Sequence, residues 1–570
     1  MGSIGDYTTA KVQPHEPYEV IDQPSRSRRK IRIIVIGAGA SALNFAHDID
    51  QSTLDLELVL YEKNPEIGGT WFENRYPGCG CDIPSVNYQF SWAPSPDWTS
   101  FYSAAPEILK YFKRVADEHD LHKYIRLSHR VIGASWNEYD EQWHVKVQRG
   151  DNPEDVFEDR AHILVNASGV LNKWKWPAIQ GRETFQGPML HSAHWNDQVE
   201  LKGKRVAVIG SGSSAVQIVP SIQPTVSSLK CFIRSASWVT AGFGQRFAGK
   251  GGANFQYTPK QKKILQNDPQ KYLAYRKKIE SELNSRFRFI LNGSEEQANA
   301  RALASRPDIA DHIVPKDFAV GCRRPTPGNG YLEALCSDNT EVVSQSIAEI
   351  TPKGIKTTDG VEHEVDVIVC ATGFDVSWRP SYPTIGRESR SLSEQWKEIP
   401  RTYLSITVPN FPNYLIFNGP FGPYGHGSFL PITETLSRHF LQILEKMSSE
   451  GITSFEPKAE AVAEFFEHHR KFMPRTAWTS PCRSWFKQGT VDGEVMMWPG
   501  SRIHFFETMK QPRWEDYHLR YTTNNRFGYL GNGFAAREFD GSDLSWYLGT
   551  LEGNEQAYLP DEDFADFMVY

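Results

Sequence analysis

A short apolar run that leads straight into a glycine-rich turn and then a helical pattern occurs twice in this chain. It constrains the fold more than any other feature. The first copy starts with residues 31–36, a β-branched run typical of a strand buried in a parallel sheet. Gly37 suits the tight turn that follows, and Gly39 lets the backbone approach a pyrophosphate. Ala42 replaces a third glycine and still allows the helix to pack closely on the strand.

The end of the next strand carries the acidic residue that such a unit needs. Residues 56–61 form a second apolar run, and Glu62 closes it about 25 residues after Gly37. A carboxylate at this point accepts hydrogen bonds from ribose hydroxyls, while the free N–H groups of the helix N-terminus bind phosphate. Strand, helix, strand and acid together predict a dinucleotide site.

The second copy of the unit ends in a cation. Residues 205–209 lead into the turn 210–215 and a helix, and the next strand, 228–233, ends at Arg234. A carboxylate there would repel a 2′-phosphate, whereas Arg234 can bind one with two parallel hydrogen bonds. The two copies therefore predict one FAD site and one site that prefers NADPH to NADH.

Composition places the chain among ordinary globular proteins. It has 570 residues, of which 39% are hydrophobic and 23% charged. The net charge of −7 argues against a nucleic-acid partner, because nucleic acid requires a basic surface. The seven scattered cysteines suggest no disulfide framework and no metal site. Since no apolar run is long enough to span a bilayer, we expect a cytoplasmic protein without a stable membrane anchor.

Residues 185–195, which read FQGPMLHSAHW, lie just before the second unit. Through Phe185, Gly187, His191 and Trp195 they resemble the FxGxxxHxxxW signature of class B flavin-dependent Baeyer–Villiger monooxygenases. The family pattern continues with Pro or Asp, whereas this chain has Asn196. As a domain linker, the signature is expected to couple movement of the nicotinamide domain to the flavin site, with His191 and Trp195 acting neither as acid nor as base.

Two charged residues match the family's active site. In the segment 321–325, Arg324 matches the second member of the family's Lys/Arg-Arg pair. The resemblance implies that Arg324 stabilises the developing negative charge of the reaction and that Asp82 holds Arg324 in place. Where the family commonly has an arginine, two residues before Asp82, this chain has Gly80. His426 lies in a loop near the cofactor and is not expected to be a base.

The units and the resemblance together predict a set of cofactor-binding residues. They are Gly37, Gly39, Ala42, Glu62, Gly69, Thr70, Trp71, Asp82, Tyr88, Val131, Gly210, Gly212, Ser213, Ser214, Gln217, Arg234, Ser235, Thr372 and Trp485.

The expected fold is α/β, with two Rossmann-like dinucleotide-binding domains of which the FAD domain is discontinuous. Ile279, Leu283 and Phe287 form a helical apolar stripe that should end near Gly293. It belongs to a helical insertion that either packs on the NADPH domain or acts as a mobile lid. The expected segments are a flexible arm (1–29), the first part of the FAD domain with the linker (30–198), the NADPH domain (199–340) with its insertion (243–315), and the second part of the FAD domain with an aromatic region (341–570).

The resemblance implies a monooxygenase reaction. NADPH reduces FAD, reduced flavin and O2 form a C4a-peroxide, and one oxygen atom is inserted next to a ketone carbonyl to give an ester or lactone. The aromatic tail suggests a bulky, polyketide- or terpenoid-like ketone, and residues 529–534 resemble fungal members of secondary metabolism. An N- or S-oxygenating flavin enzyme and a non-catalytic cofactor-binding protein are the alternatives, and the Arg324 segment favours the first reading over an N- or S-oxygenating enzyme.

Overall fold

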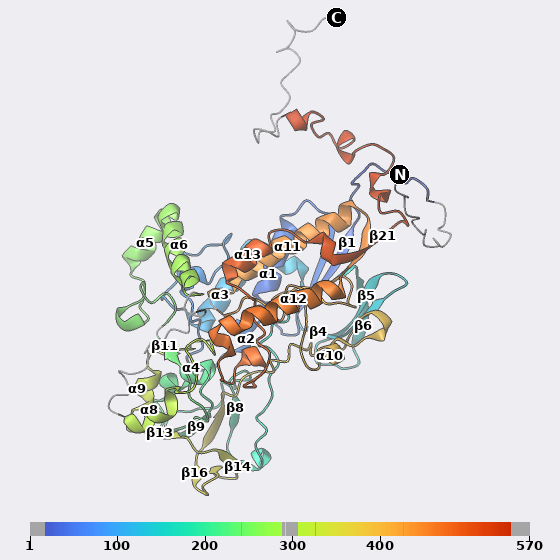
Figure 1. Ribbon diagram of the computed structural model, residues 1–570. Coiled ribbons are helices and arrows are strands. Elements are labelled where there is room, and N and C mark those ends of the chain that lie inside the picture. The colour runs from blue at the N-terminus through green and yellow to red at the C-terminus, as the bar shows by residue number, and fades with distance from the viewer. Residues whose placement is uncertain are drawn as a thin grey trace, which may run out of the picture.

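The computed structural model describes residues 18–240, 242–287, 291, 306–324, 326–425 and 427–548 (Figure 1). The expected helix end near Gly293 and the expected loop role of His426 lie outside the described residues. No helix in the described ranges is both long and apolar enough to cross a membrane.

The first glycine-turn unit builds a parallel sheet in the order β19-β7-β1-β2-β3. Strand β1 is almost entirely buried, as its β-branched sequence predicts, and helix α1 packs the apolar side chains Leu43 and Phe45 into the core. The strands are β1 (Ile31–Ile36), β2 (Leu56–Tyr61), β3 (Ile125–Arg126), β7 (Ile163–Asn166) and β19 (Tyr414–Ile416).

The second unit builds a separate sheet in the order β13-β10-β9-β17-β8. Its strands are β8 (Met189–His191), β9 (Arg205–Ile209), β10 (Ser228–Phe232), β13 (Thr340–Val343) and β17 (Val367–Cys370). The expected boundary, with the second part of the FAD domain starting at residue 341, is wrong for β13 and β17. β17 pairs with β9 and β8, so this stretch completes the second sheet instead. The linker signature also supplies a strand, β8, to that sheet.

Smaller sheets flank the two units. Residues 126–167 form a β-rich region, and Asp359-Gly360 lies in the turn that connects the antiparallel strands β15 and β16. The remaining strands are β4 (His129–Asn137), β5 (Gln142–Arg149), β6 (Val156–Ala161), β11 (Val239–Thr240), β12 (Thr326–Pro327), β14 (Ile347–Thr351), β15 (Gly354–Thr357), β16 (Glu362–Glu364), β18 (Thr384–Ile385), β20 (Ile452–Pro457) and β21 (Tyr517–Tyr521).

Helices cover the sheets and form the insertion. α11 begins at Leu430, with Pro431 in its first turn. The helices are α1 (Ala40–Asp50), α2 (Thr70–Glu73), α3 (Ala105–Glu118), α4 (Ser213–Ile222), α5 (Pro259–Asn267), α6 (Pro269–Ser285), α8 (Pro307–Ile313), α9 (Tyr331–Leu335), α10 (Leu392–Gln395), α11 (Leu430–Ser449), α12 (Ala459–Phe472) and α13 (Arg502–Thr508).

The helical insertion packs on the first unit. Ile279 and Leu283 of α6 are buried, as the apolar stripe predicts. Instead of resting on the NADPH domain, however, α6 lies against the loop after Asp82: the Asn87 side chain donates to the Arg276 carbonyl at 3.1 Å. At this face the described contacts of α6 are therefore with the first unit and not, as expected, with the NADPH domain. In Figure 1, α5 and α6 stand side by side at one edge of the molecule.

The described part of the N-terminal arm is held in place, which corrects the expectation of a loose arm for residues 18–29. The Ser25 N–H donates to the Phe534 carbonyl at 2.6 Å, and the Asn532 N–H donates to the Gln23 carbonyl at 2.8 Å. The arm thus lies along the segment that follows β21 (Figure 1). Residues 1–17 lie outside the described ranges.

Candidate active site

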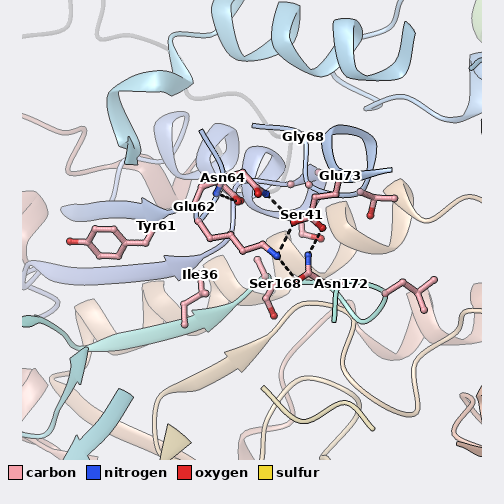
Figure 2. Close-up of a pocket in the computed structure, with 18 of the residues that line it drawn as sticks. Ile36, Ser41, Tyr61, Glu62, Asn64, Gly68, Glu73, Ser168 and Asn172 are labelled. Carbon is pink, nitrogen blue, oxygen red and sulfur yellow. Dashed lines mark hydrogen bonds and ion pairs between the residues drawn. The ribbon is translucent and has the colours of Figure 1, made fainter. Parts of the chain in front are cut away.

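A cleft of about 970 Å³, including its open mouth, lies where the carboxyl ends of β1 and β2 meet the start of α1 (Figure 2). The carboxyl edge of a parallel sheet is the usual ligand site of such folds. The predicted cofactor-binding residues that line this cleft are Gly37, Gly39, Glu62, Gly69, Thr70, Trp71, Tyr88 and Val131. The structure therefore brings together residues that span about a hundred positions of sequence.

The glycines leave this cleft open to a phosphate group. Gly37 has a φ of +106°, and a Cβ there would lie 2.8 Å from the Ala167 carbonyl oxygen. Gly39 precedes α1, and no side chain caps this helix, so its first-turn N–H groups are available to a ligand. Ala42 is fully buried and does not line the cleft, which fits its predicted role in helix packing.

Glu62 is buried at the far end of β2. Its carboxylate accepts hydrogen bonds from the N–H groups of Ala38 at 2.8 Å and Asn64 at 2.9 Å. Burial raises the pKa of Glu62, and these two hydrogen bonds oppose that rise. Since a carboxylate has four acceptor positions, it can still accept from ribose hydroxyls.

The second unit repeats this geometry. Gly210 has a φ of +126°, and a Cβ there would lie 2.4 Å from the Ala371 carbonyl oxygen. A Cβ at Gly212 would meet no atom within 4 Å, which leaves room for a ligand. Ser213 and Ser214 begin α4, which again has no side-chain cap. The turn can thus hold a second pyrophosphate.

Two arginines lie near the end of β10. Arg234 is exposed, and the Arg323 side chain lies with Nη2 3.4 Å from Oγ of Ser235. The pKa of Arg323 is lowered first by burial and then by the positive charge of Arg234. Two neighbouring cations of this kind fit an anionic group such as a 2′-phosphate.

Gln217 of α4 joins the two units. Its amide oxygen accepts from the Tyr76 hydroxyl at 2.8 Å, and its amide nitrogen donates to the Gly80 carbonyl at 2.9 Å. A Cβ at Gly78 would lie 2.4 Å from the Gln217 carbonyl oxygen, so the chain passes very close to α4 here. The described contacts give Gln217 a role between the units, and a cofactor contact stays a prediction.

Asp82 and Arg324 meet as the family resemblance implies. The guanidinium donates two hydrogen bonds to the carboxylate, one through Nη1 and one through Nη2 at 3.1 Å. Burial lowers the pKa of Arg324, but the charge and hydrogen bonds of Asp82 outweigh it, so the net direction is upward. Arg324 also lies 4.9 Å from the ring centre of Phe243. Both charges act on the pKa of Tyr88, which lines the cleft, although its rise comes first from burial.

A disulfide joins the Arg324 segment to a distant loop. Cys322 is bonded to Cys482 across 160 residues, so the expectation of a chain without disulfides is wrong at this pair. Sequence spacing could not reveal it, because only the fold brings the two loops together. The second loop carries Trp485, a half-buried ring that lies 6.5 Å from the Tyr424 ring.

Residues of the linker signature form hydrogen bonds and pack closely against neighbouring backbone. The buried His191 accepts at Nδ1 from the Ala193 N–H at 3.1 Å, which leaves Nε2–H to donate to Oγ1 of Thr372 at 3.2 Å. Burial lowers the pKa of His191 to about 4, so the ring is neutral at neutral pH. A Cβ at Gly187 would lie 2.3 Å from the Asp366 carbonyl oxygen, and Trp195 is buried. These contacts agree with a linker rather than an acid or base.

A family model of flavin-binding monooxygenase-like proteins matches residues 30–316. The chain belongs to this family. The FAD-binding monooxygenase tazF of Aspergillus terreus (strain NIH 2624 / FGSC A1156) is 39% identical over 543 residues, which cover 92% of this chain and 96% of the relative. A Baeyer–Villiger monooxygenase of Pseudomonas aeruginosa is 30% identical over 504 residues, which cover 87% of this chain and 92% of the relative.

The fold agrees with the family. The solved structure of an oxidized steroid monooxygenase bound to NADP superposes with a TM-score of 0.73 at 27% identity, covering 86% of this chain and 99% of the other. This flavin-binding monooxygenase is therefore of the Baeyer–Villiger type, and the resemblance and the fold class predicted from sequence are confirmed.

Some residues that line the cleft of this flavin-binding monooxygenase were not predicted from the sequence motifs. The Lys63 ammonium lies 2.8 Å from both the Asn172 side-chain oxygen and the Glu73 carboxylate, and Asn64 donates to Glu73 at 3.0 Å (Figure 2). This polar network lines the cleft. Lys63 and Asn64 directly follow the acid of the first unit, and that position is a signal that sequence reasoning could have used.

Proposed function

We propose that this chain is an FAD- and NADPH-dependent monooxygenase that inserts one oxygen atom of O2 next to the carbonyl of a bulky ketone. The product is an ester or lactone, and we place the reaction in the making of a secondary metabolite. The observation that carries the proposal is the Asp82–Arg324 ion pair beside the cleft of the first unit.

The residues of the first cleft fit FAD. The turn at Gly37 and Gly39 and the uncapped start of α1 would hold the pyrophosphate, and Glu62 would bind the ribose. The loop of Trp71 and Tyr88 would lie along the rest of the cofactor. Bound FAD would supply the redox and oxygen chemistry.

The second unit fits NADPH. The start of α4 would hold the pyrophosphate, while Arg234 and Arg323 would bind the 2′-phosphate between them. Trp485 would contact the nicotinamide half, because its loop is tied by a disulfide to the Arg324 segment. The relatives support both cofactors by name: tazF is FAD-binding, and the steroid monooxygenase structure holds NADP.

Arg324 would supply the fixed positive charge that oxygen insertion needs. Negative charge develops on the substrate carbonyl oxygen as an oxygen atom attacks its carbon, and a preorganised guanidinium stabilises that charge. The carboxylate of Asp82 fixes the guanidinium plane through two hydrogen bonds, so little reorganisation is required. The Phe243 ring lies over the guanidinium of Arg324, with its centre 4.9 Å away.

The test is Arg324→Ala in the FAD-loaded enzyme with NADPH and a panel of bulky ketones. We expect bound FAD and continued NADPH oxidation, with ester formation lowered by roughly 10²–10³ because one oxyanion-type donor is lost. Oxygen consumption, hydrogen peroxide and product mass report the result. Arg390→Ala, at an exposed arginine paired with Glu388, is the matched control. An unchanged ester yield in Arg324→Ala would contradict the proposal.

A further inference from the structure

Arg502 is a fully buried cation that the proposed chemistry does not use. Its exposed fraction is 0%, and none of its three guanidinium nitrogens forms a well-oriented hydrogen bond to a group in the described ranges, although Nη1 lies at ion-pair distance from Glu280. A guanidinium stays charged in a protein, so burial with so few partners needs a reason. Burial lowers the pKa of Arg502, and its one described counter-charge is Glu280.

The Glu280 carboxylate connects three distant segments. Oε1 lies 2.9 Å from Nη1 of Arg502, at the start of α13. Oε2 accepts a hydrogen bond from the Asn87 side chain at 2.9 Å, in the residue just before Tyr88. Glu280 itself stands on α6 of the helical insertion. The Glu280 carboxylate therefore connects the insertion both to the loop of Asn87 and Tyr88 and to the C-terminal region.

The same guanidinium nitrogen of Arg502, Nη1, also lies against the segment that leads to the flavin cleft. A Cβ at Gly427 would lie 1.8 Å from Nη1 of Arg502, so the guanidinium packs directly on this backbone. Gly427 has a φ of +75°, which makes any other residue strained there. Two residues later, Phe429 lines the cleft of the first unit.

Helix α6 also reaches the Arg324 side of the site. A Cβ at Gly244 would lie 3.5 Å from Cγ2 of Ile279, and the preceding residue, Phe243, covers Arg324. Two residues beyond the C-terminal end of α6, the Phe287 ring lies 6.1 Å from the Trp478 ring, which packs beside Gly425. Helix α6 thus contacts the segment beside Arg324 through Ile279 and, through the Glu280–Arg502 pair, the backbone at Gly427.

We propose that Glu280 and Arg502 are positioning residues for oxygenation, and that their ion pair is a latch that seats α6 over the site. The inference rests on the proposed function. Held in this position, α6 closes the space between Arg324 and the segment of Gly427 and Phe429, and keeps water out while oxygen is transferred. Neither residue is assigned contact with the substrate.

The first variant is Glu280→Gln, which keeps the shape and removes the charge. We expect FAD content and the rate of NADPH oxidation to stay close to wild type. Hydrogen peroxide released per NADPH should rise, and the KM for a bulky ketone should increase, by up to roughly tenfold, because a displaced wall misplaces the substrate. Glu282→Gln is the matched control, since Glu282 lies on the same helix and pairs with Arg286, the residue directly after that helix, at 3.0 Å.

A double variant separates positioning from charge balance. Glu280→Gln leaves a buried cation without its partner, which by itself destabilises a fold. Glu280→Gln with Arg502→Met removes both charges, so folding should recover while peroxide release stays high. Arg502→Lys alone keeps a cation beside Glu280, so it should form more ester per NADPH oxidised than the double variant. If the double variant regains wild-type coupling and KM, the pair only balances charge and the latch is wrong.

Limited trypsin digestion gives a readout that does not need turnover. The insertion is rich in lysine, with Lys260, Lys262, Lys263, Lys271, Lys277 and Lys278 on α5 and α6. In the FAD-loaded protein, α5 and α6 should be cut faster in Glu280→Gln than in wild type or Glu282→Gln. If wild type makes no ester from any ketone, the proposed function fails, and the digestion still decides the latch. Equal cutting in all three proteins would overturn the latch.

Discussion

The side-chain oxygen of Asn196 accepts a hydrogen bond from the Gln198 N–H at 3.0 Å, just after the linker signature. The family's aspartate could form the same turn, because Asn and Asp both hydrogen-bond to the backbone two residues on. Gly80, the other departure from the family pattern, has its own structural use. A Cβ there would lie 3.0 Å from the Ser103 carbonyl oxygen, and its own carbonyl accepts from Gln217. Both departures thus have local physical explanations.

The cofactor preference is tested at a single residue, Arg234. We expect Arg234→Ala to raise the KM for NADPH by roughly 10- to 100-fold, since hydrogen bonds between charged groups contribute about 1.5–3 kcal/mol. The KM for NADH should change little, because NADH has no 2′-phosphate. Steady-state kinetics with the two nucleotides make the comparison, and NADH serves as the internal control. Equal losses with both nucleotides would show that Arg234 does not read the 2′-phosphate.

At the scale of elements, the Cys322–Cys482 bond ties the Arg324 segment to the Trp485 loop. Closing a loop of 160 residues restricts the unfolded chain, so Cys322→Ser should lower the free energy of unfolding by about 2–4 kcal/mol. Urea unfolding without reductant measures this difference. In dithiothreitol the variant and the wild type should converge, because both then lack the bond. A denatured wild type that takes up seven alkyl groups before reduction, rather than five, would disprove the disulfide.

The predictability of an element follows from how local its signal is. Strand β1 and the turn at Gly37 are readable because a buried β-branched run and a left-handed glycine are properties of adjacent residues. The membership of β17 in the second sheet is not readable, since its apolar run would fit either sheet and only pairing with β9 decides. The packing partner of α6 is unpredictable for the same reason, because its apolar stripe shows which face of the helix is buried but not which element covers that face.

At the scale of the whole molecule, the site is assembled from pairs that are far apart in the chain. Asp82 and Arg324 were predicted to pair only because a family resemblance names both. No comparable signal exists for Glu280 and Arg502. Their ion pair joins α6, in the first half of the sequence, to α13, in the second half. Gln217 likewise bridges the two dinucleotide units through Tyr76 and Gly80. Motifs predicted the two dinucleotide units, whereas the contacts that join them required the fold.

Three buried histidines make the stability of the whole molecule depend on pH. Burial lowers the pKa of His191, His439 and His469 to about 4 each, and the exposed fraction of each is at most 2%. In the unfolded chain a histidine has a pKa of about 6.5. Above that pH the three rings are neutral in both states, so their contribution to stability is fully present.

As the pH falls from about 6.5 to about 4, the unfolded chain binds protons that the folded protein excludes, and stability is lost. Each residue can account for a loss on the order of 3 kcal/mol, which levels off below its folded pKa. His439→Gln, which keeps a donor for the Met509 carbonyl that Nδ1 approaches at 3.0 Å, should be less sensitive to acid than wild type. Melting temperatures from pH 8 to pH 4 would show a smaller fall in the variant. Parallel curves for the two proteins would mean that His439 is already protonated in the folded state.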